Sequence, residues 1–343
     1  MAADLACVVH VHSTYSDGTA TVPELLAATR HAGADVLVLT DHDTLGARRD
    51  GWEGWHDGVL LVVGMEVSPR GGHLLALGVD ELVPHAGRSE DDILRDVAEQ
   101  GGLAIAAHPF SEGSRMSRRI GRPHPWGALG NPACAGVELW SMTTDTAEDW
   151  ASPRAAIREL RAPERLDGPP AGHLARWDAL CRRRPTVAIG GLDAHQPGVR
   201  LRGRVRSIMP HARWFSLLRT HVLLEEPPRG DASDASRVVE ALRAGRCYLA
   251  LDHLGDPAGF AFSAARPGER AVMGAGAGAG EWTLRAEAPG ADGLRLLADG
   301  ELAEASEGPR LEHAVSGAGV FRVEAWRAGR RWIVGNPVYL GRP

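Results

Sequence analysis

Residues 5–18 read LACVVHVHSTYSDG, an apolar run that ends in two histidines and is followed by Asp17. The run predicts a buried strand, and residues two positions apart on a strand point to the same face. His10 and His12 can therefore share one metal ion. Residues 35–43, DVLVLTDHD, repeat the arrangement, because an apolar run again leads directly to a histidine, His42. Both stretches predict strands that deliver metal ligands at their carboxyl ends.

The same pattern recurs further along the chain. Apolar runs predict four more strands, whose ends carry Glu66, His73, His108, Asp193 and His195. Residues 21–33 and 89–101 begin with a capping hydroxyl residue and end in glycine, which predicts helices. Strands that alternate with helices predict a parallel sheet, and ligands at many strand ends favour a closed barrel over an open sheet. Imidazole and carboxylate groups without thiolates suit manganese, zinc or iron rather than a structural zinc site.

The composition narrows the class of protein. A chain of 343 residues predicts one large domain and one small one. It has no lysine, so all 38 of its basic side chains are arginines, which excludes Schiff-base lysine chemistry and a P-loop lysine. A net charge of -6 predicts no strong nucleic-acid surface. The four widely separated cysteines, the lack of a signal peptide and the lack of a long apolar window predict a reduced, cytoplasmic protein with no membrane association.

The character of the sequence changes after about residue 250. Short apolar runs flanked by glycine follow one another, and Asp299-Gly300 between two of them predicts a hairpin. We expect residues 251–343 to form a small all-β module of the immunoglobulin-like sandwich kind, after a hydrolase domain that spans residues 1–250. Residues 111–172 are expected to form long loops over the mouth of the barrel, and the glycine- and alanine-rich residues 274–280 a flexible loop.

Taken together, the motifs resemble those of the PHP (polymerase and histidinol phosphatase) domain family. The matching residues occur in the family's order: His10, His12, Asp17, His42, Glu66, His73, His108, Asp193 and His195. The resemblance covers roughly residues 5–250. It implies a distorted seven-stranded (β/α) barrel with two or three divalent metal ions (Mn, Zn or Fe) at the carboxyl ends of the strands.

The resemblance also implies three ligand sets. His10, His12, Glu66 and Asp193 would hold one ion; Glu66, His73 and His108 would hold a second; Asp17, His42 and His195 would hold a third. Asp41 and Asp43 flank a ligand and are expected to orient it. Asp17, Asp193 and His195 are the candidate catalytic residues. Trp140, Arg200 and Arg202 are candidates for contact with substrate. A buried core tryptophan explains Trp140 equally well, and a solvated loop is the simpler explanation of the two arginines.

The predicted activity is hydrolysis of a small-molecule or nucleotide phosphate mono- or diester by a hydroxide that bridges the metal ions. Fold does not determine the substrate, so two alternatives stay open. Residues 72–78, GHLLALG, resemble a segment of family members that hydrolyse carboxylic or carbamate esters on the same kind of site. The lesser alternative is a metal-stabilised barrel that binds and does not catalyse. The oligomeric state cannot be predicted from this sequence.

Overall fold

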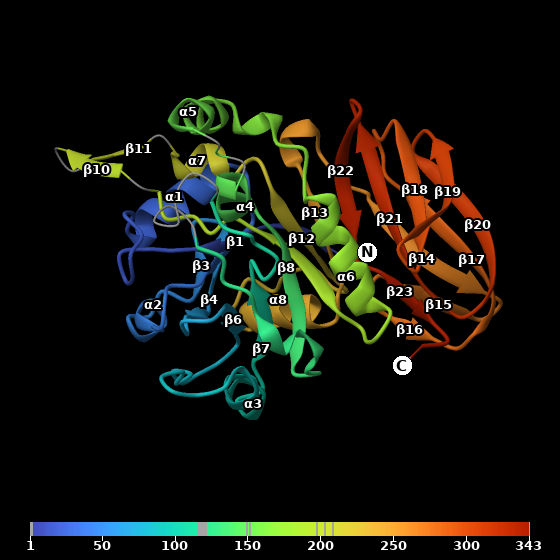
Figure 1. The fold of residues 1–343 in the computed structure, drawn as a ribbon, viewed down its shortest axis with the longest axis horizontal. Coiled ribbons are helices and arrows are strands. Elements are labelled where there is room, and N and C mark those ends of the chain that lie inside the picture. The colour runs from blue at the N-terminus through green and yellow to red at the C-terminus, as the bar shows by residue number, and fades with distance from the viewer. Residues whose placement is uncertain are drawn as a thin grey trace.

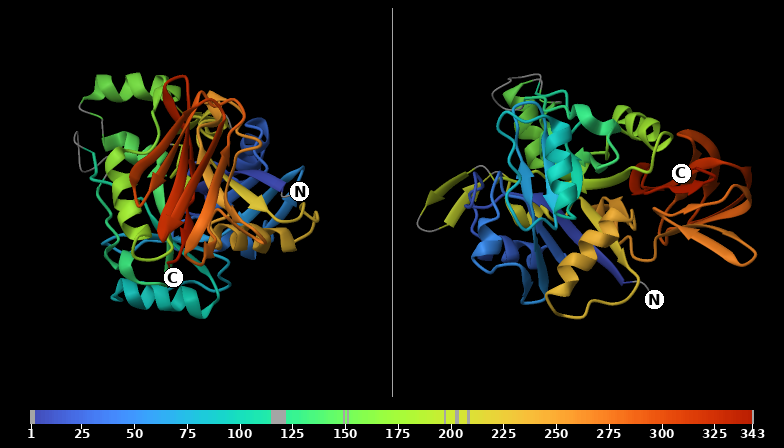
Figure 2. Two further views of the ribbon diagram at one scale, coloured as in Figure 1. Left: turned by 90° about the vertical axis from the view of Figure 1, so that its right-hand side faces the viewer. Right: turned by 90° about the horizontal axis from the view of Figure 1, so that it is seen from below.

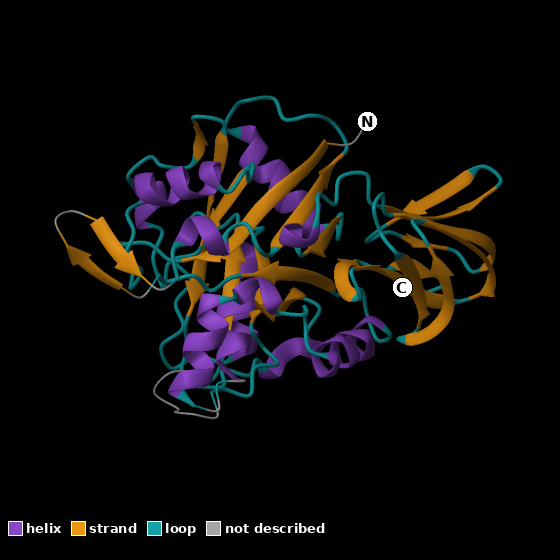
Figure 3. Cartoon of the chain, turned by 90° about the horizontal axis from the view of Figure 1, so that it is seen from above, coloured by secondary structure: helices purple, strands orange, loops and turns teal. Residues whose placement is uncertain are grey.

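The computed structural model describes residues 3–114, 122–148, 150, 152–196, 198–201, 204–207 and 209–342. It is a mixed α/β protein whose C-terminal part is built from strands and loops, whereas helices surround the N-terminal part (Figure 3). No helix in the described ranges is long and apolar enough to cross a lipid bilayer.

The largest sheet begins in the N-terminal part, with β1 at its centre. Apolar residues fill β1, and its side chains from Cys7 to Val11 are buried. It pairs in parallel with β2 and antiparallel with β12, although some 200 residues of sequence separate it from β12. In spatial order the strands are β3 (Gly54–His56), β4 (Val59–Val63), β2 (Val36–Leu39), β1 (Ala3–Val11), β12 (Arg219–Leu224) and β13 (Cys247–Ala250).

A second sheet of five strands carries the middle of the chain. Its strands, in spatial order, are β5 (Met65–Val67), β6 (His73–Leu77), β7 (Leu103–Ala107), β8 (Cys134–Ser141) and β9 (Val187–Gly191). β7, β8 and β9 are parallel, but β5–β6 and β6–β7 are antiparallel. The connection from β5 to β6 holds only residues 68–72, which is too short for a crossover helix. The all-parallel arrangement that we expected is therefore wrong for these strands.

The two sheets meet along isolated bridges. Val11 bridges to Ala194 and His42 bridges to Glu66, both in parallel. The amide of Leu192 also donates to the carbonyl of Val9 at 3.0 Å. In the described part of the chain no sheet closes on itself. The closed seven-stranded barrel that we expected is thus not found as one continuous sheet, although the strand ends that should carry the ligands do converge.

Helices cover the outer faces of these sheets (Figure 1). Their first residues follow the predicted signals: Thr21 and Glu24 form a capping box at α1, and Ser89 and Asp92 form one at α3. The helices are α1 (Val22–His31), α2 (Gly46–Arg49), α3 (Glu90–Glu99), α4 (Met142–Glu148), α5 (Pro153–Arg161), α6 (Ala171–Cys181), α7 (His211–Trp214) and α8 (Ser233–Arg243). Because α4 and α5 fall within residues 111–172, the prediction of long loops over that whole stretch is wrong.

The C-terminal part stacks two layers (Figure 2), in which the strands are antiparallel except for the parallel pair of β16 and β23. One layer holds β14 (Ala261–Arg266), β15 (Glu269–Val272), β17 (Gly280–Glu287) and β20 (Arg310–Gly317). The other holds β16 (Gly276–Ala277), β18 (Gly293–Ala298), β19 (Glu301–Glu307), β21 (Gly319–Arg327), β22 (Arg330–Gly335) and β23 (Val338–Leu340). The hairpin at Asp299-Gly300 is confirmed, because both residues have positive φ and join β18 to β19. Residues 274–280 include β16, so they are not only a loop.

The second layer is continuous with the first sheet, because β22 pairs with β13. A buried ion group also anchors the C-terminal part on α6. Arg322 of β21 donates to both oxygens of Asp178, from Nε at 2.7 Å and from Nη2 at 2.9 Å, and to Glu324 at 2.8 Å. The predicted boundary near residue 250 stays a prediction, but the sheet and this ion group run across it.

Candidate metal centre

Two histidines at the end of β1 begin the site. The backbone at His10 has φ +64°, and the pairing of β1 with β2 shifts register between Val9 and Val11. Despite this kink, both imidazoles converge on one carboxylate. Nε2 of His10 lies 3.4 Å from Asp193 Oδ1, and Nε2 of His12 lies 3.3 Å from the same atom. The expectation that the two side chains can share an ion agrees with this geometry.

Glu66 of β5 lies at the centre of the site, and its side chain is fully buried. Its two oxygens face five imidazole rings, at 3.0 to 3.4 Å: those of His10, His12, His42, His73 and His108. A buried carboxylate among so many imidazoles is placed to bridge two ions.

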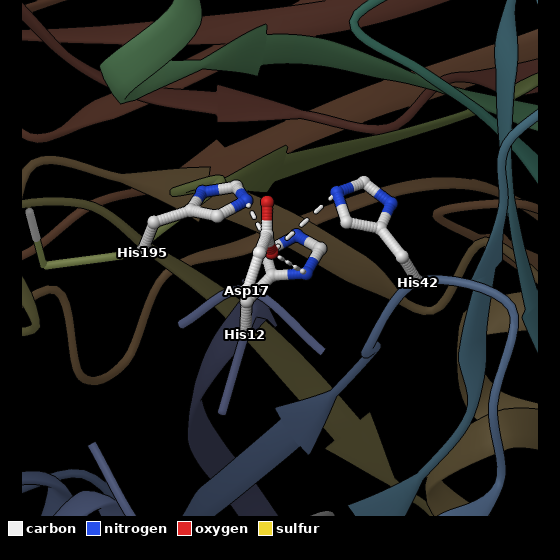
Figure 4. A group of neighbouring side chains, drawn as sticks. All are labelled: His12, Asp17, His42 and His195. Atoms are coloured by element: carbon white, nitrogen blue, oxygen red, sulfur yellow. Dashed lines mark ion pairs between the residues drawn. The ribbon is translucent and has the colours of Figure 1, made fainter. Parts of the chain in front are cut away.

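A more exposed group surrounds Asp17. Figure 4 shows the imidazoles of His12, His42 and His195 arranged around its carboxylate. Oδ1 of Asp17 lies 3.1 Å from His195 Nε2, 3.8 Å from His42 Nε2 and 3.9 Å from His12 Nδ1. The side chain of Asp17 is 59% exposed, so the site opens to solvent on this side.

The donor groups fit divalent metal ions. Three sets have all their ligand atoms within 4.8 Å of one another: His10, His12, Glu66 and Asp193; His12, Asp17, His42 and His195; and His42, Glu66 and His73. Several buried atoms have no hydrogen-bond partner among the described residues, namely Nε2 of His10, both ring nitrogens of His12, Oε2 of Glu66 and Nδ1 of His108. Buried polar atoms without partners are costly, and a cation coordinated by them would remove that cost.

These sets differ from the expected ones in detail. The first is the expected set. The third joins His42 to Glu66 and His73, whereas we expected His108 there; His108 Nε2 still lies 3.2 Å from Glu66. The second contains the expected residues together with His12. The structure therefore brings all nine candidate ligands together.

Charge governs the protonation of the exposed group. Burial lowers the pKa of His12 to about 4. Burial also acts to lower the pKa of His195, but the carboxylates of Asp193 and Asp17 outweigh it and raise this pKa to about 9. The hydrogen bond from His195 in turn lowers the pKa of Asp17 to about 2. In the protein without metal, Asp17 and His195 thus form an ion pair.

The sequence analysis missed Glu138, which lies on β8 and is almost fully buried. Its Oε1 lies 2.9 Å from His10 Nδ1, and its Oε2 accepts the amide of His108 at 2.8 Å. Such a carboxylate fixes the tautomer of a metal-binding histidine and leaves Nε2 for the ion. A lone carboxylate in the apolar run CAGVELW was the available signal.

His124 was also missed. Its ring stacks on His73 with 4.3 Å between centroids and lies 5.9 Å from His108. Burial, followed by the charges of His73 and His108, lowers the pKa of His124 to about 4. A single histidine in a loop segment offers no pattern that could have indicated this position.

The two aspartates beside His42 hold neighbouring loops of the site, and their expected orientation of His42 stays a prediction. Asp41 accepts the amide of Ser13 at 2.7 Å and the hydroxyls of Ser13 and Ser16 at 2.6 Å, and so holds the loop that carries Asp17. Asp43 accepts the amide of Ser68 at 3.0 Å.

The three candidate substrate residues have different outcomes. Trp140 lies near the end of β8 with 3% of its surface exposed and lines a pocket described below. Arg200 lies on β10 (Gly198–Leu201), which pairs with β11 (Arg204–Ser207) in a hairpin that projects from the body of the protein (Figure 1). The side chain of Arg200 and the whole of Arg202 lie outside the described residues. Their contact with substrate stays a prediction.

Comparison with known proteins gives the following relatives. No family model matches the chain. An uncharacterised protein of Methanocaldococcus jannaschii is 32% identical over 124 residues, which are 32% of this chain and 69% of that protein. A phosphoribosyl 1,2-cyclic phosphate 1,2-diphosphodiesterase of Eggerthella lenta is 40% identical over 83 residues, or 22% of this chain, and the match spans only 32% of that enzyme.

One solved structure matches along almost the whole chain. It is a two-domain protein of Bacteroides vulgatus that contains a predicted PHP-like metal-dependent phosphoesterase. The match has a TM-score of 0.47 and 15% sequence identity, and it covers 98% of this chain and 95% of that one.

Proposed function

The chain belongs to the PHP (polymerase and histidinol phosphatase) family, and on that premise we propose that it is a metal-dependent phosphoesterase that acts on a small-molecule phosphate mono- or diester. The observation that carries the proposal is the sharing of ligands. His12 and Glu66 each belong to two of the three ligand sets, so neighbouring ions would lie close enough to act on one phosphoryl group.

The described residues have distinct parts in such a reaction. Divalent ions held by these sets would polarise a phosphoryl oxygen and lower the pKa of a water molecule. The buried side chains of His10, His12 and Glu66 would hold the ions away from bulk solvent. Glu138 keeps Nδ1 of His10 occupied, so that Nε2 points to Glu66 and Asp193.

Proton transfer is assigned to the exposed side of the site. The leaving oxygen of a phosphoester needs a proton as its bond to phosphorus breaks. Asp17 and His195 lie at the open edge, with 59% and 28% of their side chains exposed, and would serve as the acid–base pair when their own ligand set holds no ion. Asp193, at 15% exposure, contacts both His10 and His12 and lies behind this pair. The small-molecule substrate and the cytoplasmic location stay predictions.

The test uses three chromogenic esters. Manganese-loaded protein is assayed with p-nitrophenyl phosphate, bis-p-nitrophenyl phosphate and p-nitrophenyl acetate. We expect turnover of at least one phosphoester, which is lost in Asp193→Ala and kept in Asp57→Ala, a carboxylate variant at a side chain that is 85% exposed. Turnover of the acetate alone would replace this proposal with the carboxylic or carbamate ester reaction. Turnover of none of the three would contradict both.

A further inference from the structure

A second pocket lies beside the metal centre and has no part in the function proposed so far. It has a volume of about 450 Å³ and is lined by Trp140 near the end of β8, Asp145 on α4, Arg158 and Glu159 on α5, and residues 165–168 and 170. Pockets for small molecules typically measure roughly 300–1,000 Å³. The space is therefore large enough for a ligand of one ring.

Two residues that line this pocket each have a buried carboxylate oxygen with no hydrogen-bond partner among the described residues. These oxygens are Oδ1 of Asp145 and Oε2 of Glu159. Asp145 is only 6% exposed, and its other oxygen accepts the amide of Ser141 at 2.9 Å, which fixes the orientation of the carboxyl group. Buried polar atoms are normally satisfied, so two unsatisfied acceptors on residues that line one pocket indicate a ligand that donates hydrogen bonds.

The charges of the pocket favour a neutral donor over an amine. Arg158 and Arg165 line it together with Glu159 and Asp167, so these formal charges cancel. Burial raises the pKa of Asp145 well above its usual range, which favours the uncharged carboxyl group. A pocket with no net negative charge does not attract an ammonium group, whereas hydroxyl groups suit both carboxyl acceptors and guanidinium donors.

The C-terminal part holds the outer wall of the pocket. Arg330 of β22 donates to the carbonyl of Glu164 at 2.8 Å, to Asp167 Oδ1 at 2.8 Å and to the carbonyl of Leu166. Its neighbour Arg331 donates to the carbonyl of Pro169 at 3.3 Å. The loop that closes the pocket is thus tied to a strand that lies more than 160 residues further along the chain.

The inner wall is shared with the metal centre. Thr144, the residue before Asp145 on α4, donates its hydroxyl to Asp193 Oδ2. The amide of Thr143 donates to the carbonyl of Leu192 at 3.2 Å. One turn of α4 therefore contacts both a metal ligand and the pocket.

We propose that this pocket binds a hydroxyl-rich, monosaccharide-like group, and that this group is the part of the phosphoester remote from phosphorus. The second half of the statement rests on the proposed function, and the first half does not. The role of the C-terminal part is then to build the outer wall of a specificity pocket.

Binding is tested without reliance on turnover. Saturation-transfer NMR is recorded on the 343-residue protein, in which magnesium replaces the paramagnetic manganese. The probes are glucose, galactose, mannose, ribose and arabinose, with ethanolamine as an amine probe. We expect at least one monosaccharide to bind, and Glu159→Gln to weaken its binding about tenfold, because a charged acceptor of a hydrogen bond is lost. Glu99→Gln, at an exposed glutamate of α3, is the matched control and keeps wild-type binding.

A variant in the outer wall gives a second, independent readout. Arg330→Ala removes the hydrogen bonds that hold the loop of residues 164–167. It should therefore also weaken binding of the sugar, although Arg330 itself does not line the pocket. Binding of no monosaccharide, or of ethanolamine alone, would overturn the proposal, as would equal affinity in Glu159→Gln and the control. Sugar binding without phosphoester turnover would support the sugar-binding pocket and refute the proposed function. Phosphoester turnover without sugar binding would refute only the sugar-binding pocket.

Discussion

The residue at position 191, at the end of β9, must be a glycine because the carboxylate of Glu138 that contacts His10 occupies the space next to it. A Cβ atom at this position would clash with Glu138 Oε1, and would lie 2.9 Å from Glu138 Cδ and 3.0 Å from His10 Cβ. The φ of Gly191 is not positive, so any effect of an alanine comes from lack of space and not from backbone strain. Gly191→Ala must therefore displace the Glu138 carboxylate.

The displacement breaks two hydrogen bonds to a charged group. They join Glu138 to His10 Nδ1 at 2.9 Å and to the amide of His108 at 2.8 Å. Each such bond is worth about 1.5–3 kcal/mol in a buried site. Loss of the carboxylate behind a metal-binding histidine typically lowers metal affinity about 10- to 100-fold, and we expect this range for manganese binding to Gly191→Ala.

Isothermal titration calorimetry with manganese measures this change directly. Gly190→Ala is the matched control, because the added methyl would meet only the ends of the Leu218 and Leu249 side chains, both at 3.0 Å. Glu138→Gln, which keeps the volume and loses the charge, should weaken binding as Gly191→Ala does. If Gly191→Ala folds and binds manganese as tightly as Gly190→Ala, the assigned role of Glu138 is wrong.

Three further predictions concern stability. Asp178→Ala leaves the buried guanidinium of Arg322 without its bidentate partner, so it should lower the free energy of unfolding by about 3–5 kcal/mol in urea titrations. The control is Asp167→Ala, at a side chain that is 79% exposed, which should lower the free energy of unfolding by less than about 1 kcal/mol. Burial acts to lower the pKa of His221, but hydrogen bonds to carboxylates, that of Asp252 foremost, raise it to about 9 from about 6.5 in the unfolded chain. This charge stabilises the protein fully below about pH 6.5 and ceases to do so as pH rises through 9. Between pH 6 and 9.5 the wild type should therefore lose up to about 3 kcal/mol more than His221→Gln; equal losses would contradict this origin. Chelation with EDTA should lower the melting temperature by several degrees and added manganese should restore it, because ligands that bind only the folded state stabilise it; an unchanged melting temperature would argue against tight binding.

The ligands could be predicted because each follows a local signal. The apolar runs before His10, His42 and Asp193 form the buried strands β1, β2 and β9, and periodicity within a few residues is enough to indicate them. The convergence of these side chains on Glu66 also follows from local information, because strands that end on one side of a sheet bring their last residues together.

The sheet order could not be predicted in the same way. β12 pairs with β1, with Leu224 opposite Ala3, although the two strands are far apart in the sequence. Nothing in either segment specifies the other as its partner. Likewise β22 extends the first sheet by pairing with β13, so the division near residue 250 in the sequence is not a division of the sheet. Pairings of this kind depend on the packing of the whole chain, whereas hydrophobic patterns report only which face of a segment is buried.

The residues that support the ligands were missed for a related reason. Glu138 and His124 act through contacts with residues distant in sequence, and each is a single polar residue with no repeat or spacing around it. α5 begins with Ser152 as its cap and Pro153 in its first turn, which is a recognisable start, but the surrounding glycine- and proline-rich sequence favoured a loop.

Metal content tests the central claim most directly. Inductively coupled plasma mass spectrometry is applied to protein that has been loaded with manganese and then desalted. The account predicts at least two ions per chain in the wild type and a clear loss in Glu66→Gln, because Glu66 belongs to two of the three ligand sets. A wild type that retains no tightly bound ion, or a Glu66→Gln variant that retains as many ions as the wild type, would contradict it.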